Sequence, residues 1–128
     1  MRILLDTHLL LWSMARSRRL SKSARATILD PRNDAYYSAA SIWEVSIKSG
    51  LGRKDFRIDP QALVRALEES GFVELPVSAI HAAGLAALPA IHRDPFDRML
   101  VAQACAEPMT LLTNDAVLAA YGPLVQLV

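Results

Sequence analysis

The sequence predicts an α/β protein, with one α/β/α sandwich built around a mainly parallel central sheet. Short apolar runs alternate along the chain with segments that carry helix caps, and this order is typical of parallel α/β folds. The hydrophobic fraction is 52% with 6% aromatic residues, so the core is expected to be aliphatic rather than aromatic. Because the 128 residues contain no repeat, low-complexity segment or linker, we expect a single domain over residues 1–128.

In the first half of the chain, caps and breakers set the ends of the predicted elements. Ser21 is a favoured helix N-cap, and Pro31 ends the helix that follows it. Tyr36 and Tyr37 favour extended backbone. The predicted elements are a strand over 2–6, helices over 9–15 and 21–30, a strand over 35–38, a helix that Ser38 or Ser41 caps and that ends at Gly50, and a mobile basic loop over 50–54.

The second half continues the alternation and contains the clearest helix signal. Asp59 and Pro60 supply an N-cap and a first-turn proline, and Gly71 stands just past the expected end of the helix. Asp94 and Pro95 repeat this start signal. The predicted elements are a helix from 59 to 70, a strand over 72–75, a short helix from Ser78 that stops before Pro89, a helix over 94–106, a strand over 110–113, a helix over 115–120 and a strand over 124–127.

The composition excludes several classes of protein. The single cysteine, Cys105, rules out an intramolecular disulfide, and its apolar neighbours favour a buried side chain over a reactive thiol. The first residues lack the long apolar region and cleavage site of a secretory signal. No apolar stretch reaches the roughly 20 residues of a transmembrane helix. We therefore expect a cytoplasmic protein without a membrane partner.

The net charge is +1, but the charges are unevenly distributed. Residues 1–64 hold 11 Lys/Arg and 6 Asp/Glu, a balance of +5, whereas residues 65–128 hold 3 and 7, a balance of −4. Basic clusters around an acidic centre would suit a bound polyanion, although ordinary solvated surface explains them as well. The two clusters are Arg16, Arg18, Arg19, Lys22 and Arg25, and Lys48, Arg53, Lys54 and Arg57.

Two acids stand at the carboxyl ends of predicted buried strands. Asp6 follows the apolar run over 3–5, and Asp115 follows the run over 110–113. Ligands of open α/β sheets bind beyond the carboxyl ends of the strands, so acids there indicate a site for a hard cation such as Mg²⁺. For Asp6 the site role is favoured over a helix cap, because an unpaired Asp is seldom buried. For Asp115 the two interpretations remain equally open.

Three further acids have strong structural explanations. Asp94 is expected to cap the helix that begins at Pro95, and Asp97 would gain from the dipole of the same helix. Glu44 could form an i,i+4 pair with Lys48. Its helix is apolar nearly all round, however, and a carboxylate there favours a site role.

The sequence offers no competing nucleophile or zinc site. His8, His81 and His92 lack the close pair spacing of zinc ligands. No G-x-S-x-G elbow, Walker loop or G-x-G-x-x-G phrase appears. Any catalysis is therefore expected to use a water activated by a metal held between carboxylates.

Four phrases, in this order, resemble those of the PIN-domain family, most closely the VapC-type toxins of bacterial type II toxin–antitoxin modules. The phrases are LLDTH at 4–8, SIWEVSIK at 41–48, HRDPFDRML at 92–100 with AQA at 102–104, and LTND at 112–115. The resemblance spans nearly the whole chain. It implies a PIN-like α/β/α fold and an endoribonuclease that depends on Mg²⁺ or Mn²⁺.

The resemblance also implies roles for particular residues. The four acids expected to be catalytic are Asp6, Glu44, Asp97 and Asp115. Asp6 and Asp97 match the positions most often assigned as metal ligands, and Thr7 and Thr113 match hydroxyl positions that support the acids. Asp94 is expected either to cap its helix or to support a metal ligand. The implied partners are an RNA substrate, a cognate antitoxin that covers the active site, and a second copy in a homodimer.

Other functions stay open at this point. One alternative is a non-catalytic RNA-binding or regulatory module on the same fold. A receiver-type phosphoacceptor also has an acidic Mg²⁺ pocket, but such domains place a Lys at a late strand end and no Lys follows Lys54. A phosphatase of the haloacid-dehalogenase type would need a second Asp two positions after Asp6, where His8 stands.

Overall fold

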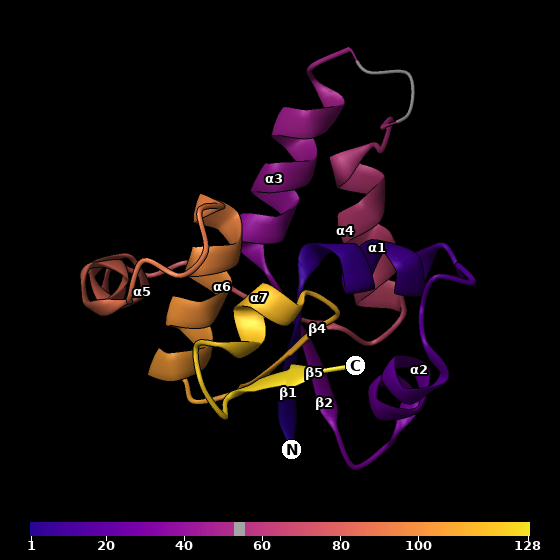
Figure 1. Ribbon diagram of the computed structural model, residues 1–128. Helices are drawn as coiled ribbons and strands as arrows, with labels where there is room; N and C mark the ends of the chain where they lie inside the picture. The colour runs from indigo at the N-terminus through magenta and orange to yellow at the C-terminus, as the bar shows by residue number, and fades with distance from the viewer. Residues whose placement is uncertain (53–55) are drawn as a thin grey trace.

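A five-stranded sheet forms the centre of the computed structural model, which describes residues 1–52 and 56–128 (Figure 1). Its strands are β1 (Arg2–Leu5), β2 (Asp34–Ser38), β3 (Val73–Leu75), β4 (Thr110–Thr113) and β5 (Val125–Leu127). The strand order is β3-β2-β1-β4-β5, and every pairing is parallel. The predicted α/β class is confirmed. The order differs from the 2-1-3-4-5 arrangement of flavodoxin-like receiver domains.

The helices agree with their predicted bounds to within two residues, except the helix after Ser78, which ends at Gly84 and is continued by a 3₁₀ turn up to Ala87. They are α1 (Thr7–Met14), α2 (Lys22–Leu29), α3 (Ala39–Ser49), α4 (Pro60–Glu69), α5 (Ala79–Gly84), α6 (Pro95–Ala106) and α7 (Ala116–Ala119), with a 3₁₀ turn at Leu85–Ala87. Part of the basic loop predicted over 50–54 lies outside the described residues. Within the ranges that the structure describes, none of these helices has the length and apolar character needed to cross a bilayer.

Each of these α-helices begins at a side chain that accepts a hydrogen bond from the first turn. Ser38, rather than Ser41, caps α3. Gly71 follows α4 with a φ of 84°, as a residue just past a helix often requires. Gly50 ends α3 in an ordinary right-handed conformation instead. The caps in chain order are Asp6, Ser21, Ser38, Asp59, Ser78, Asp94 and Asp115, so two of them, Asp6 and Asp115, are acids expected to be catalytic.

Two layers of helices cover the two faces of the sheet. Successive strand residues point to opposite faces, so Ile3 and Leu5 pack on one side and Leu4 on the other. Residues of α1, α2, α3 and α4 pack on the first side, and residues of α6 and α7 on the second. Helix α5 packs against α6 (Figure 1). The central strands are thereby buried on both faces, as parallel sheets usually are.

The prediction that Cys105 is buried is wrong, because its side chain is exposed on the last turn of α6. Burial on this helix runs from Leu100 to Ala104 and stops there. The end of α6 lies at the amino edge of the sheet, where the Arg2 guanidinium donates hydrogen bonds to the carbonyls of Glu107 and Pro108. The apolar neighbours in the sequence therefore did not indicate how far the core extends.

Candidate functional site

The carboxyl ends of β1 and β4 meet at the point where the strand order reverses. Strands β2 and β3 lie on one side of β1, and β4 and β5 lie on the other. Asp6 directly follows β1, and Asp115 follows β4 by two residues. Ligands of open α/β sheets bind in the crevice at such a switch point. The topology therefore brings two acids from distant parts of the chain to the expected ligand position.

Asp6 is a helix cap and a member of the acidic site at the same time. One oxygen of its buried carboxylate accepts the Leu9 backbone N–H at 2.8 Å, and the other accepts the Thr113 hydroxyl at 2.5 Å. The Thr113 oxygen also accepts the Asp115 backbone N–H at 3.0 Å. Burial raises the pKa of Asp6, although the bonds from Thr113 and Leu9 oppose the rise. Thr113 thus links the two strand-end acids.

Asp97 has the most perturbed pKa at this edge of the sheet. It lies in the first turn of α6 with 22% of its side chain exposed, and Asp94 caps that turn. Burial is the main cause that raises the pKa of Asp97 to about 7, and the negative charges of Asp94, Asp6 and Glu44 add to it. Three acids from three different elements therefore act on Asp97 through their charge.

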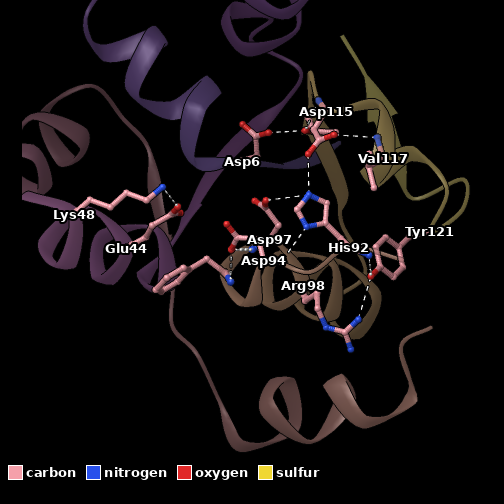
Figure 2. Close-up of polar contacts among 12 residues, drawn as sticks. Asp6, Glu44, Lys48, His92, Asp94, Asp97, Arg98, Asp115, Val117 and Tyr121 are labelled. Atoms are coloured by element: carbon pink, nitrogen blue, oxygen red, sulfur yellow. Dashed lines mark hydrogen bonds and ion pairs between the residues drawn. The ribbon is translucent and has the colours of Figure 1, made fainter. Parts of the chain in front are cut away.

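Asp115 favours the ionised form, in contrast to Asp97. Burial alone would raise its pKa, but hydrogen bonds from the His92 ring and the Val117 backbone N–H outweigh burial and lower the pKa. The His92 Nε2 atom lies 2.9 Å from Asp115 Oδ2 and 3.5 Å from Asp97 Oδ2 (Figure 2). Asp115 therefore stays ionised under conditions in which Asp97 is half protonated.

His92 is the residue that sequence reasoning missed. Its backbone N–H donates to the Tyr121 hydroxyl at 2.9 Å, and the Arg98 guanidinium donates to the same hydroxyl at 3.2 Å. Arg98 also donates to the Pro89 carbonyl, which fixes the loop before His92 to α6. Figure 2 shows Arg98 and His92 on either side of the Tyr121 hydroxyl. Zinc ligands are predicted from closely spaced pairs of histidines, and that criterion cannot identify a histidine that acts alone. Its position two residues before the Asp94 cap was the only local signal.

Glu44 combines the two interpretations that the sequence left open, an ion pair with Lys48 and a role in the acidic site. Its Oε2 pairs with Lys48 Nζ at 2.6 Å, as the i,i+4 spacing predicts. Its Oε1 is buried and has no hydrogen-bond partner among the described residues. Only 5% of the side chain is exposed, and its charge acts on Asp97. Figure 2 shows Glu44 and His92 on opposite sides of Asp97.

The other predicted residues are distributed around this centre. The Thr7 hydroxyl donates to Ser41 Oγ at 2.9 Å and so joins α1 to α3 rather than contacting a carboxylate. Arg16, Arg18 and Arg19 are exposed in or beside the turn between α1 and α2. Arg53 and Lys54, from the second basic cluster, lie outside the described residues.

The carboxylates at this edge fit a hard divalent cation. His92, Asp97 and Asp115 each offer one atom, and these atoms lie within 4.8 Å of one another. In the part of the chain that the structure describes, no Lys or Arg pairs with Asp6, Asp97 or Asp115. Carboxylate oxygens are the ligands that Mg²⁺ and Mn²⁺ prefer. A cation would also relieve the repulsion from neighbouring acids that adds to the effect of burial on the pKa of Asp97.

A family model described as the PIN domain matches residues 3–122 of the chain. That range includes every acid described above. A comparison with curated proteins finds no match.

Several solved structures share the fold over nearly the whole chain. VapBC2 from Rickettsia felis, bound to a DNA fragment from its promoter, is 17% identical with a TM-score of 0.70, covering 99% of this chain and 97% of that one. A toxin–antitoxin complex from Klebsiella pneumoniae is 24% identical with a TM-score of 0.66, covering 97% and 95%. FitAcB from Neisseria gonorrhoeae is 20% identical with a TM-score of 0.60, covering 93% and 91%.

Proposed function

Because the chain belongs to the PIN-domain family, we propose that it is a metal-dependent endoribonuclease that acts as the toxin of a bacterial type II toxin–antitoxin system. The PIN domain is a nuclease fold, and solved structures of toxin–antitoxin complexes share it with this chain. The proposal takes residues 1–128 as a single functional domain. Its reaction is hydrolysis of RNA phosphodiesters.

The observation that carries the proposal is the gathering of acids around Asp97, where no Lys or Arg of the described residues pairs with Asp6, Asp97 or Asp115. Asp6, Glu44, Asp94 and Asp115 come from four different parts of the chain, and the buried Glu44 Oε1 has no hydrogen-bond partner in the described ranges. A protein that needed these acids only as helix caps would have no reason to gather them. A bound cation gives the arrangement a physical explanation.

The proposed roles follow from the environment of each acid. Asp6 and Asp97 hold the cation, with Asp6 oriented by Thr113 and Asp97 by the first turn of α6. Asp115 and Glu44 complete the pocket, directly or through water. Because the pKa of Asp115 is lowered, its carboxylate stays ionised and can accept a hydrogen bond from the attacking water. A bound Mg²⁺ or Mn²⁺ would lower the pKa of that water and stabilise charge on a phosphoryl oxygen.

Protein partners are proposed from the apolar surface beside the acids. A groove of about 460 Å³ lies between α3 and α6, beside Val77 and Leu85. The rings of Trp43 and Phe96 line it and meet edge to face, with their centroids 5.3 Å apart. Exposed apolar surface of this kind marks sites of protein contact. It supports a cognate antitoxin or a second copy as partner. The groove is lined by Ala39, Ala40, Trp43, Val77, Leu85, Pro95, Phe96 and Met99.

The test is cleavage of total bacterial RNA by purified protein from which any antitoxin has been removed. Reactions with Mg²⁺ or Mn²⁺ are compared with reactions in EDTA, and Asp6→Asn is compared with the parent. Asp59→Asn is the matched control, because Asp59 caps α4 as Asp6 caps α1 but stands outside the acidic cluster. Asn caps helices as well as Asp does, so both variants should fold.

We expect discrete cuts by the parent and by Asp59→Asn in the presence of metal, and none by Asp6→Asn or in EDTA. Cleavage that persists without metal or without the Asp6 carboxylate would overturn the proposed chemistry. A folded protein that cuts no RNA but retains RNA in a filter-binding assay would instead be a binding module.

A further inference from the structure

The imidazole ring of His92 is fixed by hydrogen bonds on both of its nitrogens. Nδ1 lies 3.0 Å from the backbone nitrogen of Asp94, and Nε2 lies 2.9 Å from Asp115 Oδ2. Turning the ring over would place carbon atoms at both positions and break both bonds. The loop itself is anchored by Tyr121 and Arg98, as described above. The ring therefore has one orientation that satisfies its surroundings.

The partner of Nδ1 decides where the ring proton lies. A backbone N–H can only donate, so Nδ1 must accept with its lone pair. In the neutral ring the proton then lies on Nε2, which points toward the carboxylate of Asp115. An Nε2 that carries a proton has no lone pair for a metal ion. The close approach of His92 to Asp97 and Asp115 is therefore not the geometry of a nitrogen ligand.

We infer that His92 is a positioning residue whose Nε2–H orients the Asp115 carboxylate toward the acidic site, and that it does not coordinate the metal. The inference rests on the proposed function only in naming a divalent cation as the occupant of that site. Asp115 Oδ1 is already held by the Val117 N–H at 3.0 Å. The His92 bond to Oδ2 fixes the second oxygen, so the whole carboxylate has one orientation.

His81 provides a matched control elsewhere in the same protein. Its Nδ1 accepts the Ser78 backbone N–H at 3.0 Å, and its Nε2 lies 2.6 Å from Glu107 Oε2. The chemical pattern is the same as at His92, but the carboxylate is Glu107, which follows the last turn of α6. The same substitution at both histidines therefore separates an effect on the metal site from a general effect of losing such a pair.

Two substitutions divide the functions of the His92 ring. In His92→Asn the amide oxygen can replace Nδ1 and accept the Asp94 N–H, but nothing reaches Asp115. In His92→Gln the amide N–H can replace Nε2 and donate to Asp115. Mn²⁺ affinity is measured for the parent, both variants and His81→Asn by isothermal titration. Thermal melting of each protein without metal confirms that it is folded.

We expect His92→Asn to weaken Mn²⁺ binding by about 10- to 100-fold, the usual effect of losing a group that orients a metal ligand. His92→Gln should recover most of this loss, and His81→Asn should bind like the parent. Equal losses in His92→Asn and His92→Gln would overturn the donor role. An unchanged affinity in His92→Asn would overturn the positioning role.

Spectroscopy separates positioning from ligation independently of activity. In the metal-free parent, ¹⁵N NMR should find the His92 proton on Nε2, and a proton on Nδ1 would overturn the inference. Electron spin echo spectra of the Mn²⁺-loaded parent should lack the coupling of a coordinated imidazole nitrogen. A coupling that disappears in His92→Asn would show ligation instead. If no form binds metal, the proposed function fails, whereas the position of the ring proton still tests the inference.

Discussion

Helix α6 meets a histidine at each of its ends, and the two ends have different tasks. At the amino end His92 contacts Asp115 and Asp97, and at the carboxyl end His81 contacts Glu107. Both rings accept a backbone N–H on Nδ1 and turn Nε2 toward a carboxylate. At the carboxyl end one histidine meets one acid. At the amino end the ring stands among several acids, and no Lys or Arg of the described residues pairs with Asp97 or Asp115.

The comparison shows that a histidine–carboxylate pair alone does not identify a functional site. His81 is buried and joins α5 to α6, so its pair holds two helices together. His92 is partly exposed, and the pKa of Asp97 beside it is still raised to about 7. The distinguishing feature is the number of carboxylates that surround the pair, because excess negative charge needs a cation.

The largest expected difference between the two ends is in RNA cleavage. Asp97→Asn removes a proposed metal ligand, and the loss of several kcal/mol of transition-state stabilisation should reduce the cleavage rate by about 10³-fold. Glu107→Gln makes the same chemical change at the carboxyl end and should leave the rate unchanged. Rates are measured with one RNA substrate at saturating Mn²⁺. A comparable loss in Glu107→Gln would show that α6 acts through its stability rather than through its first turn.

Metal addition should stabilise the protein only through the amino end of α6. At a Mn²⁺ concentration of 100 times Kd, binding to the folded state contributes about 2.7 kcal/mol, which should raise the Tm by roughly 10 °C. Glu107→Gln should retain this shift, Asp97→Asn should lose it, and EDTA should reverse it. Melting curves with and without metal check this expectation. A full shift in Asp97→Asn would place the cation away from the candidate site.

The carboxyl end should contribute more to folding than the amino end. His81→Ala leaves the Ser78 N–H without its acceptor and removes the pair with Glu107, and should lower the free energy of unfolding by about 2 kcal/mol. His92→Ala should cost about 1 kcal/mol, because its surroundings are wetter and the crowded acids repel one another. Urea unfolding in EDTA measures both values. The reverse ranking would assign the structural role to His92.

The raised pKa of Asp97 predicts that the metal-free protein loses stability as the pH rises. The folded state binds this proton up to about pH 7, whereas an unfolded Asp releases it near pH 4. The contribution is therefore complete below about pH 4 and is lost as the pH rises through 7. Allowing for partial exposure, we expect Asp97→Asn to remove about 2 kcal/mol of this pH dependence. Parallel stability curves for the parent and variant would contradict the assignment.

Local sequence patterns predict the secondary structure and most members of the acidic cluster, but they do not predict the role of each residue within that cluster. Capping residues and prolines mark the helix ends because the first turn leaves its N–H groups unpaired wherever a helix forms. Asp6 and Asp115 could be expected at the sheet edge because each stands within two residues of the end of an apolar run. The role inferred for His92 depends on Tyr121 and Arg98, which hold its loop from two other segments. Single-sequence patterns carry no information about such contacts.

Glu44 and Cys105 show two further limits of local reasoning. The i,i+4 spacing correctly predicts the pair of Glu44 with Lys48, but it does not reveal that the second carboxylate oxygen is buried without a partner among the described residues. The apolar neighbours of Cys105 predict burial, yet the last buried residue of the helix is Ala104, one residue earlier. Burial depends on where an element lies against the sheet, and neighbouring residues do not specify that.

The hydrogen bond from Thr113 to Asp6 spans 107 residues and has a consequence for synthesis of the protein. Asp6 is synthesised long before Thr113 and Asp115, which follow only after most of the chain between them has been translated. Strand β4 must then insert beside β1 before the acids can face one another. The acidic site is therefore incomplete until the segment that holds β4 has been synthesised and paired with β1. Under the proposed function, this order of events gives a neutralising partner time to accumulate before the first molecule can act on RNA.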